Sequence, residues 1–149
     1  MSLQEQLAAD LKDAMRQRDA RRRGVLRLTL AALHNAEIEA RGELDAAAVV
    51  GVLAREAKRR RESIEEFRKA GRQDLVEKEE AELAILSAYL PQPLSREEIV
   101  QAARQAIQET GASGPKDIGK VMPVLMQQLT GRADGREVNE VVRELLAGS

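Results

Sequence analysis

The stretch GASGPKDIGKVMPVLMQQLTGRADGREVNEVVRELL, from Gly111 to Leu146, decides how the chain can fold. It holds five of the ten glycines and two of the four prolines, and its pattern predicts two short amphipathic helices joined by the loop Gly131–Gly135. Asp134 followed by Glu137 is a capping-box pattern, which satisfies free backbone N–H groups at a helix start. We therefore expect the second helix to start at Asp134 and to end at Gly148 in a left-handed turn.

The rest of the composition predicts an all-α fold. Phe67 and Tyr89 are the only aromatic residues of the 149, whereas strands favour aromatic and β-branched side chains. The absence of cysteine excludes disulfides and thiolate metal sites. No apolar run approaches the roughly 20 residues that span a membrane, so we expect no membrane partner and a cytoplasmic protein. The formal net charge is −1, so any nucleic-acid interface must be a local patch.

The first 90 or so residues predict four helices arranged as a bundle or as hairpins. The first runs from about Leu3 to Arg18, and the run Arg21–Gly24 is expected to form the turn or first turn before the second, which ends near Gly42. The third is expected from Asp45 to Gly71, and Asp74 is expected to cap the fourth. The apolar residues that mark the second helix are Val25, Leu26, Leu28, Leu30, Leu33 and Ile38.

Two closely spaced prolines mark the expected domain boundary. Prolines at 91 and 93 cannot lie inside a helix, and each moves its predecessor out of helical geometry. We expect an N-terminal helical domain at 1–91 and a small three-helix tail domain at 94–149. The tail should begin with a capping box at Ser95–Glu98. Pro123 is expected to produce a kink or a 3₁₀ start between Gly119 and Pro123.

Two segments resemble a known family. The segment GKVMPVLMQQLTGRADGREVNEVVRELL, residues 119–146, is similar to the tail domain shared by the YqeY proteins and the GatB and GatE subunits of tRNA-dependent amidotransferases. The segment RRRESIEEFRKAGRQDLVEKEEAELAILSAYLPQPLSREEI, residues 59–99, resembles the YqeY proteins alone. Pro123 departs from the pattern of the tail. The resemblance implies a tail that holds tRNA, while the ammonia-releasing and carboxylate-activating chemistry is assigned to other domains and subunits.

The sequence offers no catalytic set of its own. We find no cysteine, no serine in a defensible nucleophile setting and no phosphate-binding glycine loop after a strand. His34 and Glu37 lie one turn apart, but nothing supplies a third metal ligand. We therefore expect no cofactor and no metal, and whether a catalytic role exists in a complex stays open.

Basic side chains are the candidate RNA-binding residues, because arginine matches phosphate geometry. One cluster surrounds the end of the first helix and the second cluster lies in the third helix, and for both the alternative is solvated charge paired with nearby carboxylates. In the tail, the alternative for the glycines and Asp134 is a turn and cap without a binding role. The scarcity of aromatic residues argues against base stacking and favours recognition of RNA shape. The candidates are Arg21, Arg22, Arg23, Arg59, Arg60, Arg61, Lys116, Lys120, Arg132, Arg136, Asn139 and Arg143.

Three hypotheses follow. The first is an all-helical YqeY-like accessory factor that binds tRNA or another structured RNA. The second is a protein-interaction adaptor that docks an acidic partner or an enzyme core through basic helices. The third is an amidotransferase component. In that case the family label, carbon–nitrogen ligase activity with glutamine as amido-N-donor, would rest on resemblance only.

Overall fold

The computed structural model describes residues 1–129 and 131–148, and the described chain is helical with no strand. The predicted all-α class is therefore confirmed. The elements in chain order are α1 (Leu3–Arg16), α2 (Ala20–Ala40), α3 (Ala46–Lys69), α4 (Gln73–Ser87), α5 (Arg96–Thr110), the 3₁₀ turn η1 (Pro115–Asp117), α6 (Ile118–Leu129) and α7 (Gly135–Ala147).

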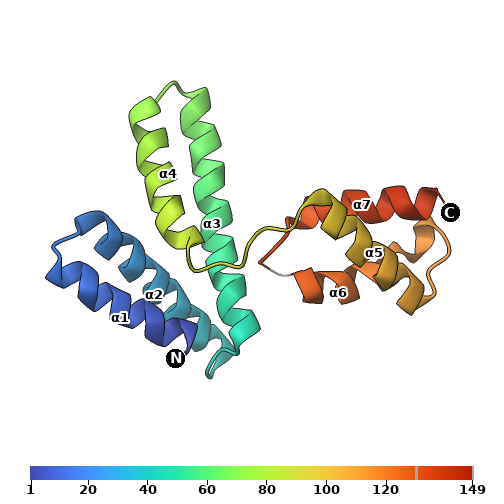
Figure 1. Ribbon diagram of the computed structural model, residues 1–149, viewed down its shortest axis with the longest axis horizontal. Coiled ribbons are helices and arrows are strands. Elements are labelled where there is room, and N and C mark those ends of the chain that lie inside the picture. Colours follow the sequence, from blue (N-terminus) through green and yellow to red (C-terminus); the bar gives the residue numbers. More distant parts are fainter. Residues whose placement is uncertain (130, 149) are drawn as a thin grey trace. The chain divides into compact units, whose positions relative to one another are not determined.

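The chain divides into two compact units, Met1–Pro91 and Gln92–Ser149. In the first, α1 pairs with α2 and α3 pairs with α4, so that two helical hairpins pack together (Figure 1). In the second, α5, α6 and α7 pack against one another, and η1 contacts both α6 and α7. Each unit has its own apolar core.

The first core is built where all four helices meet. Leu7 of α1, Leu26 and Leu33 of α2, Leu53 of α3 and Leu86 of α4 are each at most 1 % exposed. Fully burying a side chain of this size stabilises the fold by about 1.5–3 kcal/mol. In the outer half of the α3–α4 hairpin, ion pairs also link the two helices.

The second core consists of ten buried aliphatic residues from α5, α6 and α7. Because three short helices bury little surface alone, nearly every inward position is aliphatic. Its members are Ile99, Ala103, Ala106, Val121, Leu125, Leu129, Val138, Val141, Val142 and Leu146.

Several predicted caps are confirmed. Asp45 accepts a hydrogen bond from the backbone N–H of Ala48 at 2.7 Å, which starts α3. Ser95 and Glu98 form the full reciprocal capping box, and these bonds lower the pKa of Glu98. Asp134 starts α7 by accepting from the N–H of Arg136 at 3.0 Å, but the expected capping box with Glu137 does not form among the described residues.

Other predicted helix ends are wrong. The run Arg21–Gly24 lies inside α2, because Asp19 caps that helix by accepting from Arg22 N–H at 3.1 Å. α2 does end near Gly42 as expected, but the left-handed C-cap is Arg41, with φ 56°, and not the glycine. Gly148 has φ −85°, so α7 does not end in a left-handed turn.

The remaining differences concern α4 and α6. Asp74 does not cap α4, because the N–H groups of Leu75 and Val76 both donate to the Arg72 carbonyl and the helix starts earlier. The Asp74 carboxylate instead binds the Arg72 guanidinium at 3.0 Å. The 3₁₀ turn is at Pro115–Asp117, before the expected position, and α6 runs through Pro123.

Candidate nucleic-acid interface

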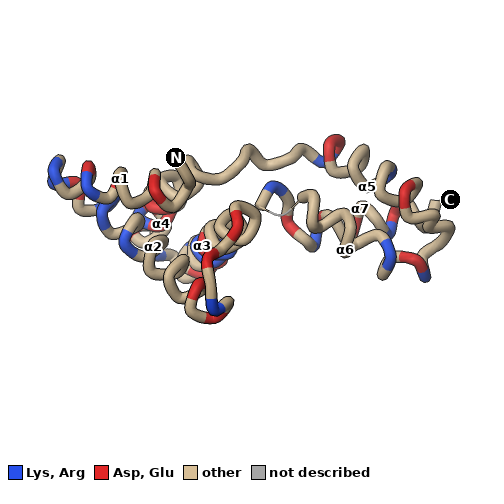
Figure 2. Tube along the Cα trace, turned by 90° about the horizontal axis from the view of Figure 1, so that it is seen from below, with Lys and Arg blue, Asp and Glu red and all other residues tan. Residues whose placement is uncertain are grey.

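The first basic cluster surrounds the tight connection between α1 and α2. Arg18 adopts left-handed geometry with φ 57°, and Asp19 then caps α2, so the chain reverses within a few residues. Consequently the cationic end of α1 and the cationic start of α2 meet at one tip of the hairpin (Figure 2). We call this set the α1–α2 cluster: Lys12, Arg16, Arg18, Arg21, Arg22, Arg23 and Arg27.

One member of the α1–α2 cluster, Arg22, forms ion pairs within the fold. Arg22 lies 3.0 Å from Asp13 and 3.8 Å from Asp10, and it is largely covered. The hydroxyl of Tyr89, at the end of the first unit, donates to Asp10 at 2.5 Å. Burial, followed by this bond, raises the pKa of Tyr89 to about 12, while the bond to Asp13 raises the pKa of Arg22. Arg22 is therefore a structural residue that ties the start of α2 to α1 and to the end of α4.

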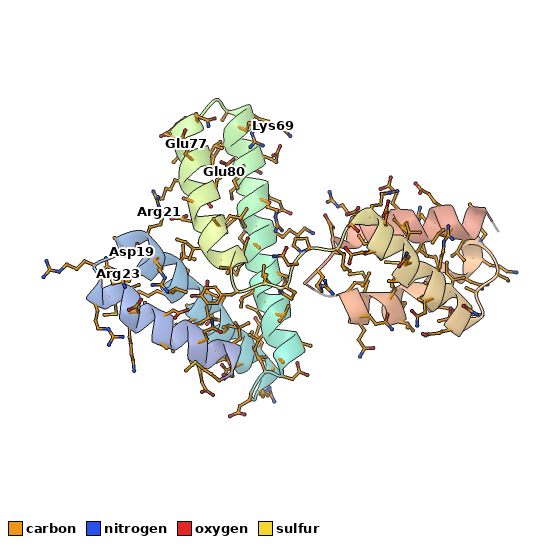
Figure 3. The ribbon with its side chains drawn as sticks, viewed as in Figure 1. Asp19, Arg21, Arg23, Lys69, Glu77 and Glu80 are labelled. Carbon is orange, nitrogen blue, oxygen red and sulfur yellow. The ribbon has the colours of Figure 1, made fainter. Side chains whose placement is uncertain are left out.

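The other members of the cluster keep their charge available. Within the described residues, none of them has a carboxylate oxygen within 4.0 Å, and Arg27 has only a long contact of 4.0 Å to the sulfur of Met15. Asp19, Arg21 and Arg23 lie at the start of α2, and the side chains of Arg21 and Arg23, two positions apart on the helix, extend in different directions (Figure 3). The carboxylate of Asp19, the acid at this tip, accepts from the backbone N–H of Arg22.

Two members of the second basic cluster, Arg60 and Arg68, pair with acids of α4. This α3 cluster is the set Arg55, Lys58, Arg59, Arg60, Arg61, Arg68, Lys69 and Arg72. Arg60 is 14 % exposed and lies 3.2 Å from Glu79 and 2.7 Å from Glu82. Nearer the hairpin tip, Arg68 pairs with Glu65 and Glu80. The neighbouring Lys69, Glu77 and Glu80 lie along the same hairpin (Figure 3).

The three consecutive arginines of the α3 cluster have different surroundings. Arg60 faces α4, as described above. Arg59 is 74 % exposed and has a 3.6 Å contact with Glu56 of its own helix. Arg61 is exposed and has no carboxylate within 4.0 Å among the described residues. Since successive helix positions are about 100° apart, the sequence run does not form one continuous face.

In the second unit, the candidates before α7 are partly engaged. Lys120 lies 3.6 Å from Asp117, whose pKa is lowered mainly by the backbone N–H of Ser113. Lys116 of η1 is exposed. Arg132 donates from Nε to the carbonyl of Gln92 at 3.1 Å.

Arg132 also holds the entrance to the second unit. Its own carbonyl accepts from the N–H of Leu94 at 2.8 Å, so two bonds fasten Gln92–Leu94 to the loop before α7. The geometry gives this residue a structural role, independent of any contact with RNA.

The two exposed sides of α7 have opposite charge. Arg136, Asn139 and Arg143 lie on one side, and within the described residues neither arginine has a carboxylate within 4.0 Å. The other side faces α5, where the single cation Arg96 reaches three acids of α7. Those acids are Glu137 at 3.9 Å, Glu140 at 4.0 Å and Glu144 at 3.2 Å. The spacing of Arg136, Asn139 and Arg143 in the sequence predicts the basic side of α7. The ion pairs between the acids of α7 and Arg96 depend on how α5 packs on α7, which the sequence does not show.

The family model of the Yqey-like proteins matches residues 4–146 of this chain. The chain belongs to the YqeY family. This confirms the resemblance of both segments to the YqeY proteins, and the matched range includes Arg60, Glu79 and Glu82 of the hairpin.

Two relatives of this YqeY protein are from fungi. "Altered inheritance of mitochondria protein 41, mitochondrial" of Pyrenophora tritici-repentis is 34 % identical over 146 residues, covering 94 % of this chain and 78 % of the relative. The protein of the same name from Lachancea thermotolerans is 41 % identical over 98 residues, covering 64 % of this chain and 52 % of the relative. The expected cytoplasmic location is wrong by this comparison, since these relatives are named as mitochondrial.

In the described residues, no helix is both long and apolar enough to cross a membrane.

Proposed function

We propose that this YqeY protein binds structured RNA, tRNA foremost, through two separate cationic surfaces. The first is the α1–α2 cluster without Arg22, and the second is the basic side of α7, with Lys116. One observation carries the proposal: among the described residues, the exposed cations of these surfaces have no carboxylate partner within 4.0 Å.

The chemistry fits a phosphate backbone. Arginine keeps its charge at any physiological pH, and its planar fork matches phosphate oxygens. The α1–α2 cluster supplies such groups from two helices that reverse direction at Arg18, which presents several cations over one short tip. A folded RNA offers closely spaced phosphates on a rigid surface, so shape recognition suits this arrangement better than base stacking.

The decisive experiment is a filter-binding titration of total tRNA over a range of salt concentrations. Removing one side chain that binds a phosphate should reduce the steepness of log affinity against log salt by about 0.7–0.9. We therefore expect Arg21→Glu with Arg23→Glu to weaken binding by roughly tenfold or more at low salt and to flatten the salt dependence by about two phosphate contacts.

A charge reversal elsewhere supplies the control. Lys78 of α4 is also exposed and without a carboxylate within 4.0 Å in the described chain, and it lies outside both proposed surfaces. Lys78→Glu changes net charge by the same amount per residue and should leave the salt dependence unchanged. Equal reductions of affinity in both variants, or no tRNA binding by the native chain, would overturn the proposal.

We further propose that the protein acts as an accessory factor beside a glutamine-dependent amidotransferase, on the resemblance of residues 119–146 to the tails of GatB and GatE. In this role the chain holds RNA and the partner performs the chemistry. A reconstituted assay should show faster glutamine-dependent amide formation when the chain is added. A rate that stays unchanged removes this role without affecting RNA binding.

A further inference from the structure

One face of α2 has apolar side chains that the core does not use. Leu28 and Ile38 are each 61 % exposed, although both belong to the apolar pattern of the helix. Leu28, Ala31, Asn35 and Ile38 follow one another at spacings of three, four and three, so they form one stripe along the helix. All four are on the outside of the helix pair, with Leu28 and Ile38 the most prominent apolar members. We call this the α2 stripe.

The α2 stripe borders a groove of about 630 Å³ between α2 and α3. Leu28, Ala31 and Asn35 line it from α2, while Arg55 and Arg59 line it from α3. The small side chains Ala32 and Ala36 are part of the α2 wall, which leaves the groove open to an incoming side chain.

Cations flank the Leu28 end of the stripe on both sides. On the α3 side, Arg55 has no carboxylate within 4.0 Å in the described chain, and Arg59 has only its 3.6 Å contact with Glu56. On the α1 side, Arg27 contacts the sulfur of Met15. Two of the three acids that line the groove are already engaged, Glu56 by Arg59 and Glu79 by Arg60, which leaves Glu39. An apolar strip between two cationic borders matches a helix with an apolar face and acidic flanks.

We infer that the groove between α2 and α3 docks an acidic amphipathic helix of a protein partner. The partner's apolar residues pack on Leu28 and the alanines, and its carboxylates pair with Arg27, Arg55 and Arg59. A second copy of this chain fits poorly, because its own α2 stripe would bring the same cationic borders against these. RNA fits poorly too, because phosphates gain nothing from an aliphatic strip.

The test uses a defined probe, a fluorescent peptide of ~18 residues, long enough to lie along α2 as a helix of about 27 Å. Leucine stands at every third and fourth position and glutamate on both flanks. Anisotropy titration should show saturable binding. Leu28→Asp should weaken binding at least tenfold, since it puts a charge where an apolar contact forms. Arg55→Glu with Arg59→Glu should weaken it several-fold, more at low salt.

Two controls separate docking from general effects. Lys78→Glu should bind as the native chain does, and a probe with lysine in place of every glutamate should not bind. Because Leu28 is mostly exposed, circular dichroism of Leu28→Asp should show an unchanged fold.

Three outcomes would overturn the inference. The first is absence of binding to the acidic probe or equal binding of the lysine probe. The second is sedimentation of the chain alone as a dimer that Leu28→Asp dissociates, which would make the stripe an interface between copies. The third is a loss of tRNA binding by Leu28→Asp as large as its loss of probe binding, which would assign the groove to RNA. Failure of tRNA binding in the filter assay leaves this docking site standing, because the two use different variants.

Discussion

The α1–α2 cluster and the α3–α4 hairpin have similar runs of arginine, yet their charges are used in opposite ways. In the hairpin, Arg60 is 14 % exposed and held by two glutamates across the helix pair. At the α1–α2 tip, Arg21 and Arg23 have no carboxylate within 4.0 Å in the described chain. The density of cations in a sequence therefore does not identify a binding surface.

The difference comes from what lies opposite each helix. α4 contributes acids at positions 79, 80 and 82, so Arg60 and Arg68 of α3, which face α4, both meet carboxylates. α1 contributes Asp10 and Asp13 to one arginine, Arg22. Arg60 and Arg68 on the hairpin stabilise the fold, whereas Arg21 and Arg23 at the tip remain available for a partner. Substitutions in the two regions should consequently change different measured quantities.

The largest effect is expected for Arg60→Ala. Removing the guanidinium leaves Glu79 and Glu82 partly buried and uncompensated, which should lower the free energy of unfolding by about 2–3 kcal/mol, below the cost at a fully buried pair. Urea unfolding of the first unit can be followed by fluorescence of Tyr89, the only tyrosine in a chain without tryptophan.

Arg61→Ala is the matched control, because this exposed neighbour lies on the same helix and has no carboxylate within 4.0 Å in the described chain. Its effect should stay within about 0.5 kcal/mol. Neither variant should change tRNA affinity as much as Arg21→Glu with Arg23→Glu. Similar decreases of stability for Arg60→Ala and Arg61→Ala would mean that the hairpin pairs contribute nothing.

Much of the fold could be predicted because local signals and packing agree. Asp45 and Ser95 start helices as their side chains dictate, and the low content of aromatic residues excludes an extensive sheet. The helix ends that were predicted wrongly each had two candidate residues close together. The left-handed C-cap of α2 is Arg41 and not the adjacent Gly42. The N-cap of α4 is Arg72 and not Asp74, because the preceding turn determines where the helix can begin.

The candidate site was harder to predict, because charge pairing between helices depends on distances across the fold. The sequence places Arg22 between Arg21 and Arg23, yet of these three it is Arg22 that lies within reach of Asp10 and Asp13. Likewise, nothing local distinguishes Leu28, which is exposed, from Leu26, which is buried. The faces of α2 pack against different neighbouring helices, so its buried apolar residues do not share one face.

A smaller effect is expected for the hydrogen bond between Tyr89 and Asp10, beside Arg22 of the α1–α2 cluster. Tyr89→Phe removes the hydrogen bond to Asp10 and should cost about 1 kcal/mol at neutral pH. The pKa of Tyr89 is raised from 10.0 to about 12, so the folded state favours the neutral phenol. Its contribution is complete below pH 10 and is lost as the pH rises towards about 12.

The measurement is urea unfolding of both proteins by circular dichroism from about pH 8 to about pH 12, a range that brackets the ordinary and the raised pKa of the phenol. The difference in stability between native chain and variant should shrink above pH 10, and absorbance at about 295 nm should show the late ionisation of Tyr89 in the native chain. A constant difference over that range would mean that Tyr89 ionises alike in the folded and unfolded states.

The smallest effect on stability is expected at Arg18, where a single substitution tests both the turn and the RNA-binding surface. Arg18→Gly relieves left-handed geometry in a non-glycine residue and should raise stability by roughly 0.5–1 kcal/mol. It also removes one cation from the proposed RNA surface, so the salt dependence of tRNA binding should flatten by about one phosphate contact. Arg41→Gly is the matched control, with φ 56° at the other end of α2. It should gain the same stability while tRNA binding stays unchanged. If Arg18→Gly binds tRNA as the native chain does, Arg18 serves only the turn, and the cationic surface is confined to the helices beside it.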